Sequence, residues 1–275
     1  MDTPVFYPDL KIVPIADIKL QEYVQKSRVR PLSEVIKKER VLRNPPIVTD
    51  FFDNKYLQLD GANRITAVGE LGYPNCAVQI VDYSDPTHVH LLSWSHVIRV
   101  NKEELLAKIK AIPGVTVHET REFNHQELLR AEVVGVMVFT DKTIYEVIAR
   151  SSLESFVGAA NALVSLYKDQ MVERVFSGSP WTVESIAERF RRYPESNLFV
   201  TFANYSPQQV MKVIDRGLLM PAGVTRHVVY RRKLNVNVPL EYLSIMPVEK
   251  ANEKLQQFLQ PRAVRLYEEP VIYFE

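Results

Sequence analysis

Glycine is scarce in this chain of 275 residues, which contains only nine. Average usage of about 7% would give roughly twice that number, so the chain has few places for a glycine-rich phosphate loop. Accordingly, the sequence contains no G-x-x-x-x-G-K-[ST] loop, no G-x-G-x-x-G run and no H-E-x-x-H helix. A phosphate site in this protein must therefore be built from something else.

Cysteine is nearly absent as well, with Cys76 as its sole representative. One cysteine excludes an internal disulfide framework and a cysteine-based zinc cluster, and it is compatible with a reducing compartment. Three histidines at strand-like spacing lack an acidic or cysteine partner that would complete a zinc set. They are His88, His90 and His96. Zinc chemistry is therefore not expected.

Excess charge and long apolar runs are also missing. Lys and Arg number 34 against 33 Asp and Glu, which gives a formal charge of +1 and disfavours a general DNA-coating role. The longest apolar run, residues 133–139, is too short for a bilayer, which takes about 20 residues. Residues 1–11 lack the basic and apolar regions of a signal peptide. We expect a cytoplasmic protein that does not act at a membrane.

The local patterns that are present predict an α/β (α+β) fold with interleaved strands and helices. We expect a first domain over residues 1–111, a second α/β domain over 112–246, and a C-terminal helix and tail over 247–275, with an edge strand in the last fifteen residues. Strands are predicted at 11–15, 45–48, 55–59, 76–83, 93–100, 132–140, 143–149, 197–202 and 228–231. Helices are predicted at 31–40, 63–71, 102–112, 153–171, 182–193, 206–216 and 249–260.

A predicted strand-to-helix junction carries the run Leu59-Asp60-Gly61-Ala62-Asn63-Arg64. A helix start presents unpaired N–H groups and a partial positive charge, which suit a phosphate. Gly61 lets a ligand approach the backbone, and Arg64 can add a bidentate clamp. Asp60 would face the same phosphate, where it could hold a magnesium ion or accept a proton. On spacing alone, a simple helix cap at Asp60 is an equally good interpretation.

The remaining candidates are weaker when each is taken alone. The run Thr225-Arg226-His227 offers donors that could surround phosphate oxygens, although an Arg-His pair at a strand end is more often a solvated surface pair. Glu22 could act as a general base, but one exposed Glu is usually ordinary surface. Trp94 is more often a core or sheet aromatic than a ligand contact.

Together these positions resemble the free L-serine kinases built on the ParB/sulfiredoxin-like nucleotide-binding fold, a family with a staphylococcal siderophore-cluster branch and an archaeal ADP-dependent branch. The run from Ile15 to Glu22 resembles the segment that ends in the family's catalytic Glu, and the run from Leu59 to Arg64 resembles its Asp-Gly-x-x-Arg phosphate turn. Leu92-Ser93-Trp94 falls where the family has a substrate-contacting Trp. Thr225-Arg226-His227 matches its nucleotide clamp. The resemblance spans residues 11–243.

The resemblance implies a ParB/sulfiredoxin-like N-terminal nucleotide-binding domain and phosphoryl transfer from ATP or ADP to the hydroxyl of L-serine, giving O-phospho-L-serine. Glu22 would take the hydroxyl proton and, with Trp94, contact serine, while Asp60 would orient the hydroxyl or hold Mg²⁺. Residues 61–64 would hold the transferring phosphates, and residues 225–227 would grip the rest of the nucleotide from the second domain. A downstream phosphoserine-using enzyme, in siderophore or amino-acid biosynthesis, is a candidate partner.

One departure from the family concerns the phosphoryl donor. Archaeal members carry two histidines where this chain has Ala62 and Asn63, which removes two imidazoles from the phosphate environment. Between ATP and ADP we favour ATP, because the chain is nearer to the siderophore-type branch.

Three other interpretations stay open. A ParB-like nucleotide-dependent DNA-binding transcriptional regulator predicts a basic recognition helix soon after the first domain, where the pattern indicates strands. Basic clusters at residues 189–192 and 231–233 are usually solvated faces, yet they leave DNA open as a secondary partner. A sulfiredoxin-like reductase needs a cysteine inside the phosphate turn, and Cys76 lies after the following helix. A nucleotide-binding regulator without turnover would follow if Glu22 pointed away from the cleft.

Overall fold

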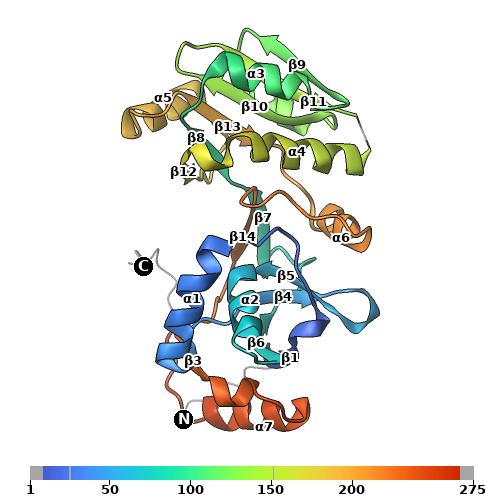
Figure 1. Ribbon diagram of the computed structural model, residues 1–275, viewed down its shortest axis with the longest axis vertical. Helices are drawn as coiled ribbons and strands as arrows, with labels where there is room; N and C mark the ends of the chain where they lie inside the picture. Colours follow the sequence, from blue (N-terminus) through green and yellow to red (C-terminus); the bar gives the residue numbers. More distant parts are fainter. Residues whose placement is uncertain (1–8, 25, 151, 267–275) are drawn as a thin grey trace. The chain divides into compact units, whose positions relative to one another are not determined.

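The computed structural model describes residues 9–24, 26–150 and 152–266, which divide into two compact units (Figure 1). Unit 1 takes its described residues from 1–19, 24–89 and 229–275, and unit 2 takes them from 20–23 and 90–228. The chain therefore passes between the units four times. Both units are discontinuous in sequence. The domain limits expected at residues 111 and 246 stay a prediction.

Unit 1 is built on a five-stranded mixed sheet. Its strands are β1 (Leu10–Pro14), β2 (Ile18–Lys19), β4 (Ile47–Asp50), β5 (Tyr56–Asp60) and β6 (Asn75–Ile80). Their order is β1-β6-β4-β5-β2, in which the β1–β6 and β4–β5 pairs are antiparallel and the other two are parallel. The helices are α1 (Lys26–Glu39), α2 (Ala62–Glu70) and α7 (Val248–Leu259). A short ladder joins β3 (Val41–Leu42) to β15 (Val238–Pro239).

The strands predicted at 45–48 and 55–59 pair as a hairpin, which explains where β5 ends. β4 pairs with β5 across a turn in which Asp53 and Asn54 have φ of 56° and 55°. Asn and Asp tolerate this left-handed backbone better than other non-glycine residues, so the pair fixes the register of the hairpin. Val48 and Leu57 are fully buried and anchor the hairpin in the sheet. Asp60 is the last residue of β5, two positions before the first residue of α2.

Unit 2 is built on a six-stranded antiparallel sheet in the order β12-β8-β13-β10-β11-β9. Its strands are β8 (Ser95–Ile98), β9 (Val115–Thr120), β10 (Val133–Phe139), β11 (Ile144–Ala149), β12 (Met171–Val175) and β13 (Leu198–Phe202). Its helices are α3 (Lys102–Lys110), α4 (Leu153–Tyr167), α5 (Val183–Arg192) and α6 (Pro207–Asp215). Short 3-10 helices lie at 125–129 and 168–170 in unit 2, and at 15–17, 52–54 and 240–243 in unit 1.

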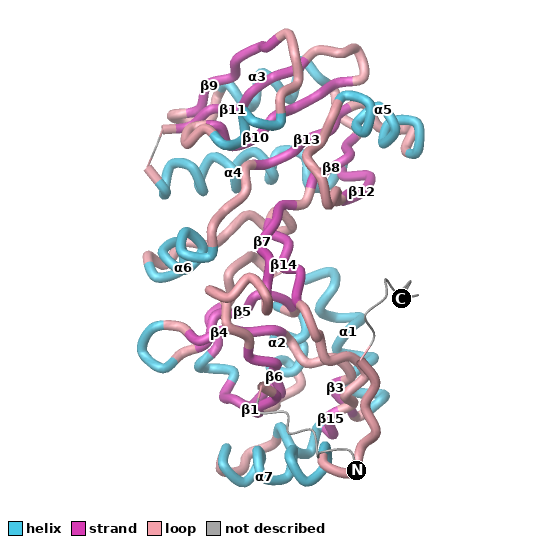
Figure 2. The backbone as a smooth tube through the Cα atoms, turned by 180° about the vertical axis from the view of Figure 1, so that it is seen from behind, coloured by secondary structure: helices cyan, strands magenta, loops and turns pink. Residues whose placement is uncertain are grey.

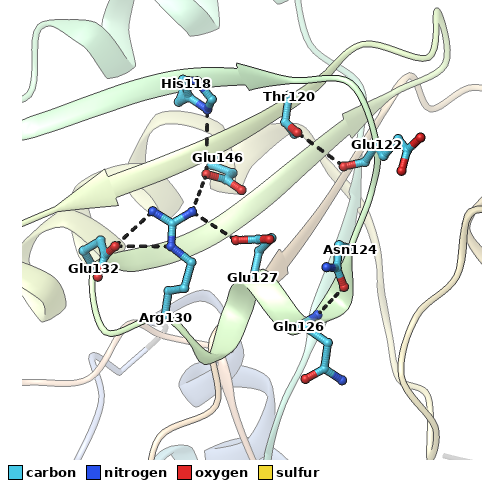
Figure 3. Close-up of polar contacts among 9 residues, drawn as sticks. All are labelled: His118, Thr120, Glu122, Asn124, Gln126, Glu127, Arg130, Glu132 and Glu146. Carbon is cyan, nitrogen blue, oxygen red and sulfur yellow. Dashed lines mark hydrogen bonds and ion pairs between the residues drawn. The ribbon is translucent and has the colours of Figure 1, made fainter.

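One edge of the unit 2 sheet carries a charged network centred on Arg130 (Figure 3). The guanidinium bonds Glu127 at 3.0 Å and Glu132 at 2.9 Å, and it lies 3.4 Å from the buried Glu146 of β11. His118 of β9 lies 3.9 Å from the same Glu146 carboxylate. These contacts attach the 3-10 helix at 125–129 to the sheet, and they involve none of the residues that the sequence predicts for function.

Two strands link the units by chain connection. β7 (Val89–Ser93) and β14 (Thr225–Val229) form a two-stranded sheet, and Figure 2 shows them side by side. Each strand contains a point at which the chain passes from one unit to the other. Just beyond these strands the Trp94 N–H donates to the Val224 carbonyl at 2.7 Å, which ties the start of β8 to the loop before β14.

Several predicted boundaries are wrong in detail. α1 begins at Lys26, so Pro31 lies inside the helix and not in its first turn. At this position Pro31 cannot donate a hydrogen bond to the carbonyl of Ser27, four residues earlier, so the helix has one intrahelical bond fewer. The strand predicted at 228–231 begins at Thr225, so the Thr-Arg-His run lies on β14 and not before it. The predicted terminal edge strand falls largely outside the described residues, and residues 261–266 form no strand. No helix in the described part of the chain is long and apolar enough to cross a membrane.

Candidate functional site

The first cluster lies in unit 1, where β5 passes into α2. Gly61 is the N-cap of α2 with φ of 93°, a left-handed conformation that favours glycine. A side chain at this position would also be too close, because an added Cβ would lie 2.8 Å from Nη2 of Arg64. The N-cap residue is Gly61 and not Asp60, so the helix cap lies one residue after the position that spacing alone allowed. Ala62 and Asn63 form the first residues of α2.

Arg64 is held firmly in this cluster. Its Nη2 donates to Oδ2 of Asp60 at 2.8 Å, and its Nη1 donates to the Asn44 carbonyl at 2.6 Å. The side chain is 18% exposed, and burial lowers the pKa of its guanidinium while the Asp60 carboxylate opposes that shift. A guanidinium fixed on one side by a carboxylate and a carbonyl is positioned to donate hydrogen bonds to an anion at a helix start.

Arg232 is a member of this cluster that sequence reasoning missed. Its Nη2 donates to the same Oδ2 of Asp60 that Arg64 contacts. The basic run at 231–233 suggested a solvated face, whereas its neighbour Lys233 contacts Asp9 and Arg231 is exposed. The three basic residues therefore do not form one patch. Arg232 differs from its two neighbours by its contact with Asp60, which is 172 positions away in sequence. No local sequence pattern could reveal such a contact.

The fit of a magnesium ion at Asp60 depends on these two arginines. The carboxylate and the two guanidinium groups together carry a charge of +1, which repels a bare cation and attracts phosphate. Among the described residues no group of three or more His, Cys, Asp or Glu side chains is arranged to hold a metal. Mg²⁺ commonly binds one carboxylate together with substrate phosphates. Asp60 as the protein ligand of a magnesium ion that arrives on a nucleotide stays a prediction.

The second cluster lies in unit 2 and begins with Glu22. The segment 20–23 pairs with the chain at Met220, whose N–H donates to the Gln21 carbonyl at 2.7 Å. Next to this pairing, Oε2 of Glu22 accepts a hydrogen bond of 3.0 Å from the Gly223 N–H. The buried Gln21 places Nε2 at 3.5 Å from Nδ1 of His227. The structure thus brings Glu22 to the predicted Thr-Arg-His strand.

Arg226 and Trp94 also belong to this second cluster. The guanidinium carbon of Arg226 lies 4.1 Å from the ring centroid of Trp94 and 4.1 Å from that of Phe176. The cation therefore lies in the angle between two rings whose planes are 75° apart, and burial lowers the pKa of its guanidinium. This arrangement corrects the interpretation of residues 226 and 227 as a solvated surface pair. Phe176 follows β12 and was not predicted, since nothing in its local sequence indicates that it would meet β14.

The predicted site residues therefore fall into two clusters. Residues 60–64 lie in unit 1 and are joined there by Arg232. Glu22, Trp94 and residues 225–227 lie in unit 2, with Thr225 buried on β14. The roles expected for these residues, and the meeting of the two clusters on one nucleotide, stay predictions.

Cys76 is a buried residue of β6 in the centre of unit 1. Burial raises the pKa of its thiol to about 12, so the thiol is protonated at neutral pH. Because the thiolate is the nucleophile in cysteine chemistry, this residue is unsuited to the reductase alternative.

No protein-family model matches the chain. Curated relatives do resemble it over most of its length. The chain is 24% identical to the ATP-dependent L-serine kinase SbnI of Staphylococcus aureus over 273 residues, which is 97% of both chains. It is 25% identical to the ATP-dependent L-serine kinase of Staphylothermus marinus over 247 residues, covering 87% of this chain and 93% of the relative. The chain is similar to L-serine kinases from end to end.

Solved structures give the same fold. A C-terminally truncated SbnI superposes with a TM-score of 0.69 at 22% identity, covering 91% of this chain and 95% of that one. A point-mutant free serine kinase in complex with AMP superposes with a TM-score of 0.69 at 19% identity, covering 88% and 97%. The expected mixed α/β fold class is confirmed, and the resemblance to serine kinases is supported. The ParB/sulfiredoxin label stays a prediction.

Proposed function

We propose that this protein is a nucleotide-dependent kinase of free L-serine, which transfers a phosphoryl group to the serine hydroxyl and releases O-phospho-L-serine. The observation that carries the proposal is the similarity to two ATP-dependent L-serine kinases over 97% and 87% of the chain. The geometry adds support, because each unit contains a cluster suited to one half of the reaction. Phosphoryl transfer needs positioning and charge neutralisation more than covalent chemistry from the protein.

The unit 2 cluster suits the serine half of the reaction. Glu22 accepts the proton of the serine hydroxyl as the hydroxyl oxygen attacks the terminal phosphorus, and the bond from that phosphorus to the leaving nucleotide oxygen breaks. Trp94 and Arg226 belong to the same unit as Glu22, and the Arg226 guanidinium packs against the rings of Trp94 and Phe176. A guanidinium in this position can bind the carboxylate of an amino acid or a phosphate oxygen.

The unit 1 cluster suits the phosphate half. The start of α2 and the two guanidinium groups of Arg64 and Arg232 supply positive charge at one place. Asp60 holds both guanidinium groups in position through Oδ2. When bound to the nucleotide, Mg²⁺ neutralises further charge on the phosphates.

We infer that ATP is the donor. Both curated relatives, from Staphylococcus aureus and from Staphylothermus marinus, are named ATP-dependent. The product, O-phospho-L-serine, carries a phosphate that can act as a leaving group. The expected partner is therefore a downstream enzyme of siderophore or amino-acid biosynthesis that displaces this phosphate.

A DNA-binding regulator is the less favoured function. Its recognition helix would follow the first domain, whereas β9, β10 and β11 occupy residues 115–149 there. The basic run 231–233 that left DNA open is divided between ion pairs with Asp60 and Asp9 and an exposed Arg231.

The direct test is an assay of the full chain with Mg²⁺, L-serine and ATP or ADP, in which O-phospho-L-serine is measured by mass spectrometry. Glu22→Gln and Asp60→Asn are each expected to lower the rate about 100-fold or more, because general-base and charge-positioning contributions reach that size. Both substitutions keep the size of the side chain, so the circular dichroism spectrum is expected to stay unchanged.

Two exposed carboxylates provide matched controls. Glu34→Gln on α1 and Asp50→Asn on β4 make the same chemical changes in exposed residues, and they are expected to retain the wild-type rate. A wild-type protein that forms no phosphoserine with either nucleotide would contradict the function. An active protein whose Glu22→Gln variant keeps its rate would contradict the role of Glu22.

A further inference from the structure

His96 lies on β8 in the interior of unit 2, with no exposed surface. Its Nδ1 is 2.9 Å from the Tyr167 hydroxyl, and its Nε2 is 2.9 Å from the Gly223 carbonyl. A carbonyl can only accept, so Nε2 carries the hydrogen and donates it to Gly223. In the neutral imidazole Nδ1 is then the acceptor, and it receives the hydroxyl hydrogen of Tyr167.

Gly223 connects this buried histidine to Glu22. Its carbonyl accepts from His96, and its own N–H donates to Oε2 of Glu22 at 3.0 Å. The residue lies in a turn closed by the Val224 N–H on the Pro221 carbonyl at 3.2 Å. Its φ of 73° is the value that the third residue of a type II turn requires, which favours glycine.

The space around Gly223 reinforces this requirement. A Cβ built on Gly223 would overlap the guanidinium of Arg174, so the backbone is enclosed on that side. The carbonyl side of the residue is fixed by His96, and Arg174 occupies the place of a side chain. The direction of the N–H that reaches Glu22 is therefore set by groups in the interior of unit 2.

We propose that His96 is a positioning residue for phosphoryl transfer, which holds the Gly223 turn so that the Gly223 N–H orients the Glu22 carboxylate, with Tyr167 fixing the imidazole tautomer. The inference rests on the proposed function, and it adds residues that neither the sequence patterns nor the resemblance assigned. His96 does not touch the reacting atoms in this scheme. It acts through one backbone residue.

The neutral state of His96 suits this role. Burial lowers the pKa of the imidazole to about 4, while the hydrogen bond to the Gly223 carbonyl opposes that shift and the charge of Arg174 adds to it. The ring is therefore uncharged at neutral pH, so it holds the turn without adding a positive charge to the interior. A neutral ring with one donor and one acceptor also permits a single arrangement between Tyr167 and Gly223.

The test compares two amide substitutions that differ in reach. In His96→Gln the amide nitrogen lies as many bonds from Cα as Nε2 does, so it can donate to the Gly223 carbonyl. In His96→Asn the amide nitrogen corresponds to Nδ1 and falls short of that carbonyl. We expect His96→Asn and His96→Leu to lower kcat about 10-fold to 100-fold, the size expected for a misplaced catalytic group, with little change in KM. His96→Gln is expected to restore most of kcat.

A double substitution of His96 and Glu22 distinguishes a positioning role of His96 from a general effect on stability. In a Glu22→Gln background, His96→Leu is expected to cause no further decrease in kcat, because coupled residues are not additive. Ser95→Ala is the matched control, since it removes a buried hydrogen bond of 3.1 Å to Thr201 from the next residue of the same strand. It is expected to lower the melting temperature while leaving kcat unchanged.

Tyr167→Phe keeps the ring and removes only the hydroxyl, so it tests the same network if His96→Leu does not fold. We expect a smaller decrease in kcat for this variant. Suppose that the wild type is active but His96→Asn and Tyr167→Phe retain full kcat, or that His96→Leu lowers kcat equally with Glu22 and with Gln at position 22. Either result would overturn the His96 proposal and leave the proposed function intact. A wild type that forms no phosphoserine would overturn the proposed function and this inference together.

Discussion

Asp60 illustrates at the residue scale how one carboxylate can organise a cationic site. Its Oδ2 accepts from both Arg64 and Arg232, which would otherwise repel each other. The three side chains come from β5, α2 and the segment after β14, so the pair of guanidinium groups exists only in the folded unit 1. Asp60 therefore has a role before any substrate binds, in addition to the role proposed for it in the reaction.

The Arg232→Gln substitution tests the residue that local sequence patterns did not reveal. It removes one of the two positive charges at the start of α2, and a hydrogen bond to a charged group contributes about 1.5–3 kcal/mol. We expect KM for ATP to rise about 10-fold or more by that measure, with a smaller change in KM for serine. Steady-state kinetics with each substrate varied in turn provide the measurement.

Arg231→Gln is the matched control for Arg232→Gln. It makes the same change at the adjacent, exposed position and leaves the net charge of the protein equal to that of the Arg232 variant. KM for ATP is expected to stay at the wild-type value. Equal increases in KM for the two variants would show that only overall charge matters and that the contact with Asp60 does not.

At the element scale, the start of α2 depends on a left-handed residue. Gly61→Ala would place a side chain at φ of 93°, which costs about 1–2 kcal/mol, and would push against Arg64 and Pro46. We expect a lower free energy of unfolding by about that amount, together with a raised KM for ATP because Arg64 is displaced. Urea unfolding and kinetics on the same preparation measure the two effects.

A substitution of Gly72, which lies just past the end of the same helix, distinguishes the effect of backbone strain from the effect of displacing Arg64. Its φ is 85°, and a Cβ added there would meet no atom within 4 Å. Gly72→Ala is therefore expected to lower the free energy of unfolding by a similar amount while KM for ATP stays unchanged. A raised KM in Gly72→Ala would mean that loss of stability alone weakens nucleotide binding.

Elements with local signals were predicted well from the sequence. The helix predicted at 102–112 is present as α3, where the Asn101 side chain accepts from the Glu104 N–H at 2.9 Å and caps the first turn. The strands predicted at 45–48 and 55–59 are also present and meet across the Asp53-Asn54 turn, since each of these signals lies within a few residues of its effect. The start of β14 was placed wrongly because the pairing that defines this strand comes from β7, far away in sequence.

At the scale of the whole molecule, the sequence predicted which residue types matter better than which residues meet. The Glu22 contact with Gly223 spans 201 positions, and the cation–π contacts join Trp94, Phe176 and Arg226 from three separate segments. Local periodicity carries no information about such contacts. The discontinuous units have the same origin, because segment 20–23 belongs to unit 2 although unit 1 residues flank it on both sides.

The stability of the whole fold toward acid is expected to depend on His96. Because the ring is buried, its pKa is lowered from 6.5, the ordinary value for histidine, to about 4 in the folded protein. Above pH 6.5 the imidazole is neutral in both states and imposes no penalty. As pH falls from 6.5 toward 4, only the unfolded chain binds the proton, so the free energy of unfolding decreases by about 3 kcal/mol in total.

Both tryptophans, Trp94 and Trp181, belong to unit 2, so their fluorescence during urea unfolding reports on the unit that contains His96. The His96→Gln variant has no titrating group at this position and serves as the reference, because all other acid-sensitive groups are common to both proteins. The wild type is expected to lose stability relative to the variant between pH 6.5 and pH 4, and to run parallel to it at higher pH. Parallel curves across the entire range would show that the imidazole is not held neutral in the folded state.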